Sequence, residues 1–164
     1  MQNFILEATK TTPFVRLSAA DGVFEIKGKS HSEDSLGFFR RIIEQLAQYQ
    51  SAQPKLTADI FLEYFNTSSA KCLFDVTKAL EKIQDKGYDV EVNWFYEEDD
   101  MDMIEIGEDY ADLSDVKFNF IGVREEEFQE QLDQLEIHYE YKPKSTSKFM
   151  TVPLGKLNRL GGTA

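Results

Sequence analysis

The sequence contains one cysteine and two histidines, so the residues that build many catalytic and metal sites are scarce. Cys72 has no second cysteine with which to form an internal disulfide, and its place in a helical pattern predicts a small buried hydrophobe. His31 and His138 lie far apart, and the chain has no Gly-x-Ser-x-Gly, glycine-rich phosphate or His-Glu-x-x-His motif. We therefore expect a protein that is not an enzyme, uses no cofactor or metal, and places each histidine in a surface or capping role.

Basic residues and long apolar runs are also few. The chain has 18 lysines and arginines and 30 aspartates and glutamates, which gives a formal net charge of -12. Such a chain repels nucleic acid phosphates and anionic lipid surfaces, so we expect neither as a partner. No apolar run approaches the roughly 20 residues that cross a bilayer, and Met1–Glu7 lacks the features of a secretory signal. These absences predict a cytoplasmic protein.

Apolar and aromatic residues are plentiful enough to build a core. They make up 41% of the 164 residues and include 13 phenylalanines, 7 tyrosines and one tryptophan. A chain of this size and composition is expected to fold without disulfides or metals. We expect a regulatory domain at residues 1–123, followed at 124–164 by an extension with a short helix, an extended segment and a basic tail.

The spacing of the apolar residues predicts alternating strands and helices. Strands are expected at residues 14–19, 23–29, 56–65, 88–96 and 116–123. An Asp-Gly turn joins the first two strands as an N-terminal β-hairpin, and helices are expected after the second, third and fourth strands. Ser30 or Ser32 is the expected cap of the first helix. This order suits an α/β fold with a STAS-like mixed β-sheet of about five strands and helices packed against it.

The segment after residue 124 has a different pattern. Phe128, Leu132 and Leu135 recur at helical spacing and predict a short helix. Ile137, Tyr139 and Tyr141 alternate with polar residues and predict an extended segment. The tail at 142–164 holds five basic residues and no acidic ones.

The polar run Asn66-Thr67-Ser68-Ser69 stands between a predicted strand and a predicted helix. All four residue types favour the N-cap of a helix, but one cap is enough, and either Asn66 or Thr67 would serve. A phosphate on Thr67 would instead lie where free N–H groups and the positive helix end stabilise an anion, with Lys71 one turn on as a counter-charge. The run therefore has two interpretations, a helix cap and a phosphorylation switch.

Ten acidic residues and no basic ones lie between residues 97 and 115. A calcium loop is the obvious hypothesis, but with Glu98, Asp100 and Asp102 as the first ligands the position that requires glycine falls on Met103. The spacing favours a solvated acidic helix face or an electrostatic docking surface for a basic partner.

Three separated motifs resemble those of the SiaC-type regulatory phosphoproteins of bacteria. The run at 65–71 resembles the family's Leu-Asn-Thr-Ser-Ser-x-Lys signature, and the run at 30–35 resembles its Ser-x-x-Glu-Asn-Ser segment. The run at 92–96 is similar to its Trp-x-Tyr strand, and the acidic run at 105–110 fits the helix that follows. The likeness covers about residues 12–123.

The resemblance implies a STAS-like fold whose threonine, here Thr67, is phosphorylated by a dedicated serine/threonine kinase and dephosphorylated by a PPM-type phosphatase. In the family's best-known branch the unphosphorylated form binds and activates a diguanylate cyclase, which raises cyclic di-GMP and favours biofilm. Asn66, Ser68, Ser69 and Lys71 would form the phosphorylated loop and its partner-binding surface.

Two features depart from the family pattern and leave the partner open. Asp34 stands where the family commonly has asparagine, and residues 124–164 have no counterpart in the likeness. An anti-sigma factor antagonist, or a scaffold in another partner-switching pathway, would use the same phosphorylated helix start. A small metal-dependent enzyme built on the acidic segment is the third hypothesis.

Overall fold

The computed structural model describes residues 3–141 and the side chains of residues 3–135. The strands of this part of the chain are β1 (Phe4–Leu6), β2 (Phe14–Ser18), β3 (Val23–Ser30), β4 (Lys55–Phe65), β5 (Asp89–Glu97) and β6 (Lys117–Val123). The helices are α1 (Ser35–Ala47), α2 (Thr67–Asp85), α3 (Met101–Asp112) and α4 (Glu125–Tyr141).

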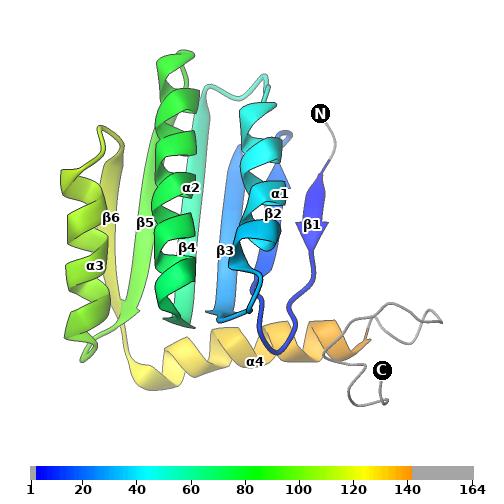
Figure 1. Ribbon diagram of the computed structural model, residues 1–164, viewed down its shortest axis with the longest axis vertical. Coiled ribbons are helices and arrows are strands. Elements are labelled where there is room, and N and C mark those ends of the chain that lie inside the picture. Colours follow the sequence, from blue (N-terminus) through cyan, green and yellow to red (C-terminus); the bar gives the residue numbers. More distant parts are fainter. Residues whose placement is uncertain (1–2, 142–164) are drawn as a thin grey trace.

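The strands form one mixed sheet in which their order follows the chain from β1 to β6. β1, β2 and β3 pair antiparallel, whereas β3, β4, β5 and β6 pair in parallel. Each parallel connection must cross over the sheet, and α1, α2 and α3 make these crossings side by side on one face (Figure 1). The predicted α/β fold, mixed sheet and N-terminal hairpin are confirmed. The sequence missed β1, which adds a sixth strand at the edge.

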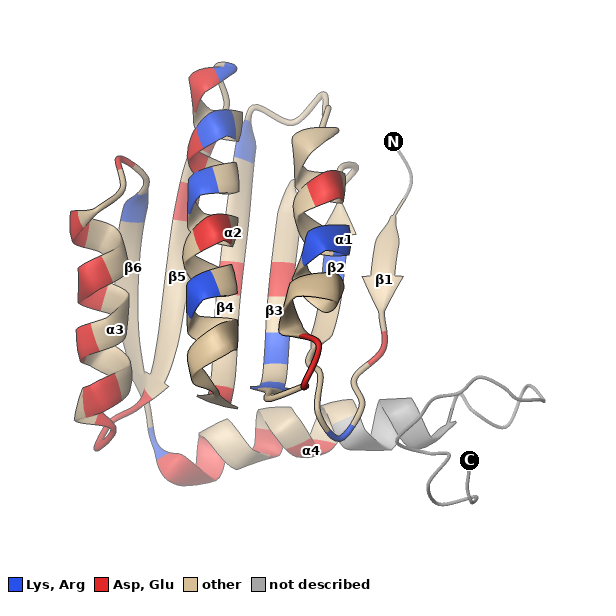
Figure 2. Ribbon diagram, viewed as in Figure 1, with Lys and Arg blue, Asp and Glu red and all other residues tan. Residues whose placement is uncertain are grey.

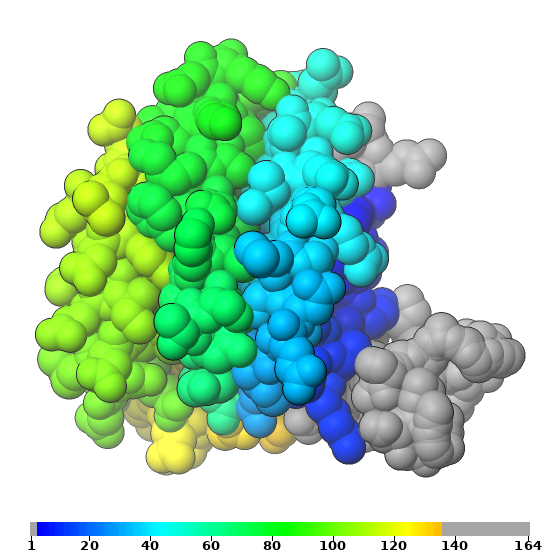
Figure 3. Space-filling view, in the orientation of Figure 1, coloured from blue at the N-terminus to red at the C-terminus, as the bar shows by residue number. Residues whose placement is uncertain are grey.

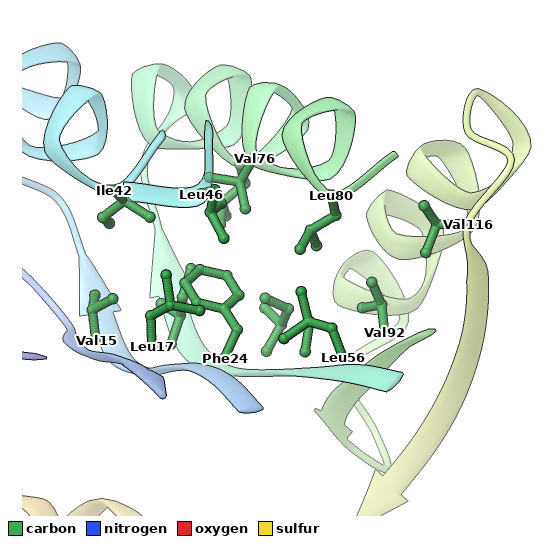
Figure 4. Close-up of a cluster of buried hydrophobic side chains, with 14 of the residues drawn as sticks. Val15, Leu17, Phe24, Ile42, Leu46, Leu56, Val76, Leu80, Val92 and Val116 are labelled. Carbon is green, nitrogen blue, oxygen red and sulfur yellow. The ribbon is translucent and has the colours of Figure 1, made fainter. Parts of the chain in front are cut away.

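The main core lies between the sheet and these three helices. Alternate residues of β4, including Leu56, Ala58 and Ile60, are buried against the helices. Figure 4 shows apolar side chains of α1 and α2 facing those of the strands, with Leu46 and Leu80 among them. Each large side chain buried in this way contributes about 1.5–3 kcal/mol to folding, so the crossover helices are held firmly on the sheet.

α4 crosses the opposite face of the sheet, near the ends of the strands that lead into the helices (Figure 1). Phe128 of α4 stacks on Phe61 of β4 with ring centroids 4.3 Å apart, and Leu132 joins the same small cluster. The short helix predicted after residue 124 is therefore confirmed. The extended segment predicted at residues 137–141 is wrong, because α4 continues to Tyr141. Once a helix is nucleated, each further residue adds a hydrogen bond at little extra cost, and this outweighs a weak alternation of apolar residues.

The cap predicted for the first helix is also wrong. Asp34 caps α1, because its Oδ1 accepts a hydrogen bond from the Gly37 backbone N–H at 3.0 Å. Ser30 is instead the last residue of β3 and is buried, while the Ser32 hydroxyl accepts a hydrogen bond from the Asp34 N–H. Ser30, Ser32 and Asp34 are all residue types that favour an N-cap, so the sequence did not distinguish among them. The conformation of the turn after β3 places Asp34 at the cap position.

The basic tail predicted at 142–164 lies outside the described residues, and the domain boundary at residue 123 stays a prediction. Among the helices described, none combines the length and apolar character needed to span a bilayer.

α3 lies directly on the indole ring of Trp94. The Trp94 Nε1–H donates a hydrogen bond to the Met103 carbonyl at 3.0 Å, and Gly107 faces the ring one turn later. A Cβ atom added to Gly107 would lie 2.6 Å from the Trp94 Nε1 atom. Glycine is therefore needed here for close approach, although it is a weak helix former.

We predict that Gly107→Ala destabilises the protein. Alanine is favoured over glycine in a helix by about 1 kcal/mol, but the clash with Trp94 should outweigh that gain and leave a net loss of roughly 1–3 kcal/mol. Urea unfolding followed by the fluorescence of Trp94, the single tryptophan, measures the change. Glu108→Ala alters the neighbouring exposed position of α3 and should leave the unfolding free energy within about 0.5 kcal/mol. Equal or greater stability of Gly107→Ala would contradict the close packing.

Candidate functional site at the paired helix starts

Two strand-to-helix turns meet at one end of the sheet. β3 and β4 run in parallel and end together, with Ser30 and Phe65 as register partners. The Asn66 N–H donates a hydrogen bond to the Ser30 carbonyl at 3.0 Å, which fastens the second turn to the first. α1 and α2 therefore begin side by side, and the carboxyl ends of parallel strands are where open α/β sheets usually place their polar sites.

The four residues of the polar run have separate roles. The Asn66 side chain caps α2, because its Oδ1 accepts a hydrogen bond from the Ser69 N–H at 2.9 Å. Thr67 is the first residue of α2 and is exposed. Within the described chain its hydroxyl has no hydrogen-bond partner. Because Asn66 already provides the cap, the Thr67 hydroxyl is left open to solvent.

The serine hydroxyls join the two helix starts internally. Ser69 is fully buried, and its Oγ lies 2.7 Å from the Ser30 Oγ and 3.1 Å from the Ser35 Oγ. The exposed Ser68 hydroxyl donates to the Ser35 Oγ at 3.0 Å, so three elements share one hydroxyl cluster. We call Ser30, Ser35, Ser68 and Ser69 the serine cluster. Because its buried members satisfy one another, the cluster holds the two turns in one arrangement.

The two helix starts differ in charge. The carboxylate of Asp34 lies at the N-terminus of α1 and offsets the partial positive charge of that helix end. α2 is capped by the neutral side chain of Asn66, and its first turn contains no acidic residue. An anion attached at Thr67 would therefore be the first negative side chain at the start of α2, where the helix dipole and free N–H groups stabilise it.

Lys71, the expected counter-charge, lies one turn after Thr67. Its ammonium group is 3.5 Å from the Asp75 carboxylate, and 74% of the side chain is exposed. An exposed pair of this kind contributes less than about 1 kcal/mol, so Lys71 is free to turn toward a phosphate. Its role as a counter-charge stays a prediction.

Cys72, Asp100 and His31 lie in surroundings that indicate structural roles. Cys72 is buried in the main core, as predicted, and burial raises the pKa of its thiol. Asp100, from the acidic run, caps α3 by accepting a hydrogen bond from the Met103 N–H at 3.1 Å. His31 lies beside the ring of Tyr64. In the part of the chain that the structure describes, no three His, Cys, Asp or Glu side chains converge as a metal-binding group.

Tyr110 connects α3 to the first turn of α2, a contact that no sequence motif indicated. Its hydroxyl donates to the Ala70 carbonyl, and its ring packs edge-on against Trp94. Burial raises the pKa of Tyr110 to about 12. Tyr110 recurs at helical spacing with Met103 and Ile106, but periodicity carries no information about the partner of a phenol group.

Fold and site together place the protein among the open-sheet α/β domains whose polar site lies at the ends of parallel strands. The sequence profile of the SiaC family regulatory phosphoproteins matches residues 6–123. The chain belongs to this family, which confirms the resemblance seen in the motifs.

Relatives from Pseudomonas aeruginosa share the fold. An uncharacterized protein of strain UCBPP-PA14 is 27% identical over 121 residues, which cover 73% of this chain and 94% of that protein. The crystal structure of apo-SiaC matches with a TM-score of 0.66 and 26% identity, covering 74% of this chain and 100% of that one. A chain in the crystal structure of the diguanylate cyclase SiaD in complex with its activator SiaC matches with a TM-score of 0.67 and 25% identity, covering 73% and 99%.

The buried phenol of Tyr110 predicts a loss of stability in alkaline solution. An unfolded tyrosine ionises near pH 10, whereas folded Tyr110 stays protonated to about pH 12. Its contribution is therefore complete below pH 10 and decreases as the pH rises toward 12. Wild type should lose about 1–1.5 kcal/mol more than Tyr110→Phe between pH 9 and pH 11.

Urea unfolding of both proteins at several pH values measures this difference. Tyr64→Phe, which removes the hydroxyl of an exposed tyrosine, is the matched control and should follow wild type. Parallel pH profiles for wild type and Tyr110→Phe would rule out the assigned role of Tyr110.

Proposed function

We propose that the protein is a signalling phosphoprotein whose unphosphorylated form binds and activates a diguanylate cyclase and thereby controls cyclic di-GMP and biofilm formation. Phosphorylation of Thr67 switches this binding off. The observation that carries the proposal is the exposed Thr67 hydroxyl at the first position of α2, with no hydrogen-bond partner in the described chain. Support for the partner comes from the family and from the SiaD–SiaC complex of the related protein.

The surroundings of Thr67 suit a reversible modification. A phosphate there adds about two negative charges beside the free N–H groups of α2, so the helix is stabilised and remains folded. The buried part of the serine cluster does not include Thr67 and would stay intact. Phosphorylation would then change the charge and shape of the surface without rearranging the core.

Two enzymes are needed to operate such a switch. A serine/threonine kinase must reach the Thr67 hydroxyl, and a PPM-type phosphatase must reach the phosphate. Solvent exposure of Thr67 permits both reactions, whereas the fully buried Ser69 permits neither. Ser68 is exposed, but its hydroxyl is bonded to Ser35 and Asn66. The site therefore favours Thr67 over its neighbours.

The test is the affinity of Thr67 variants for the diguanylate cyclase encoded in the same genome. Thr67→Ala should bind and activate it as wild type does, and Thr67→Glu should bind at least about tenfold more weakly, or about 1.4 kcal/mol. Calorimetry and a cyclic di-GMP assay measure the two effects. Ser68→Ala is the control for the phosphorylated hydroxyl, and mass spectrometry should still find the phosphate on Thr67.

Equal affinities of Thr67→Ala and Thr67→Glu would contradict the switch. Recovery of a serine-kinase-type anti-sigma factor in a pull-down from native cells, without a cyclase, would redirect the function to an anti-sigma factor antagonist.

A further inference from the structure

A groove of about 440 Å³ lies between the outer sides of α1 and α2. The two helices stand next to each other on the face shown in Figure 3. Apolar groups contributed by both helices line it, namely Ile43, Leu46, Ala79 and Ile83. Its α2 side is bordered by three lysines, Lys78, Lys82 and Lys86. The groove thus has an apolar centre and a basic border.

The basic border continues along α2 to the candidate phosphorylation site. The residues that connect Thr67 with this border, together with the border lysines themselves, are spaced by three or four residues, which places them on one face of the helix. They are Thr67, Lys71, Asp75, Lys78, Lys82 and Lys86. At the rise of an α-helix this α2 stripe is roughly 28 Å long. Thr67 therefore lies at one end of the same face that borders the groove.

α1 extends the groove in the same direction. Leu36, Arg40, Ile43 and Ala47 also follow helical spacing, and the last two line the groove. Leu36 is 63% exposed at the start of α1, and Arg40 is exposed one turn later. An exposed leucine and arginine thus continue the apolar and basic character toward the end of the groove where both helices begin.

The charge of this surface is opposite to that of most of the molecule. The chain has a net charge of -12, and α3 and the start of α4 carry mainly acidic residues, whereas lysines and arginines recur along α1 and α2 (Figure 2). α2 also carries Asp75, Glu81 and Asp85, but of these three only Asp75 lies on the α2 stripe. Asp75 is the one acidic residue that lines the groove. Lys82 has neither an ion pair nor a hydrogen bond within the described residues. The surface is therefore suited to a partner with negative charges.

We propose that this groove binds an acidic amphipathic helix of the protein's effector. The apolar side of such a helix fits the apolar centre, and its acidic flank pairs with the α2 stripe. The chain's own tail at 142–164 is excluded as the occupant, because its five basic and no acidic residues would be repelled by the lysines. The assignment of this helix to a diguanylate cyclase rests on the proposed function.

The same geometry explains how phosphorylation releases the partner. Phosphate on Thr67 adds about two negative charges to a face that otherwise carries four lysines and one aspartate. It also offers Lys71 an intramolecular partner one turn away. The phosphate on Thr67 would then repel an acidic helix that lies along the α2 stripe. Lys71, paired with the phosphate, would attract that helix less.

The test uses the full-length chain labelled with ¹⁵N and a synthetic amphipathic helix of about 20 residues. The probe carries leucine on one side and glutamate on the flanks, and the control peptide has lysine in place of glutamate. We expect only the acidic peptide to shift the amide signals of Ile43, Ala79 and Ile83. Added salt should weaken its binding.

Lys82→Glu is the decisive variant, because Lys82 is exposed and its replacement breaks no internal contact. It should weaken binding of the peptide and of the cyclase about tenfold. Lys117→Glu makes the same charge change on the sheet face away from α1 and α2, where Lys117 pairs loosely with Glu91. This control should stay within about twofold of wild type.

The outcomes separate this proposal from the proposed function. Equal binding of the two peptides, or shifts confined to other elements, would overturn the groove proposal, as would self-association of the free chain through these residues. If cyclase binding responds to Thr67→Glu but not to Lys82→Glu, the switch stands and the groove is wrong. If the cyclase does not bind but the acidic peptide occupies the groove, the groove stands and the effector is a different protein.

Discussion

The parallel pairing of β3 with β4 is the interaction on which the candidate site depends. It ends with Ser30 beside Phe65, so the turns that follow both strands leave the sheet at the same level. The Ser30 carbonyl then accepts the Asn66 N–H, and Ser69 reaches back to the Ser30 hydroxyl. Two turns that are more than 30 residues apart in sequence become one polar site because the strands before them share a register.

The buried part of this site explains why its exposed part is available. The Asn66 side chain accepts the Ser69 N–H and so caps α2, and Ser69 contributes its hydroxyl to a closed set of hydrogen bonds. Thr67 is left with no structural task for its hydroxyl. A residue of this kind is suited to modification, because a new group on it does not break an existing contact. The neutral cap of α2, in contrast to the acidic cap of α1, leaves that helix end able to stabilise an anion.

The same crossovers that build the fold create the groove next to the site. Because β3, β4 and β5 follow one another in parallel, α1 and α2 must lie on the same face and begin at the same end of the sheet. The sheet does not cover all the apolar side chains of α1 and α2. Ile43 and Ala79 are among those that line the groove between the two helices. The helix that starts at Thr67 therefore also carries the lysines of the basic border.

The sequence by itself determined the order of elements, the hairpin and the long helix after Asn66, because periodicity and turn residues are local signals. It also marked Thr67, through the excess of cap-forming residues and the family motif. Only the tertiary structure decided which residue caps each helix, that Ser69 is buried while Thr67 is exposed, and that Tyr110 joins α3 to α2. Those outcomes depend on contacts between segments far apart in the chain. The sequence does not determine them, because a hydroxyl or carboxylate has several possible hydrogen-bond partners nearby. Packing of the sheet selects one of them.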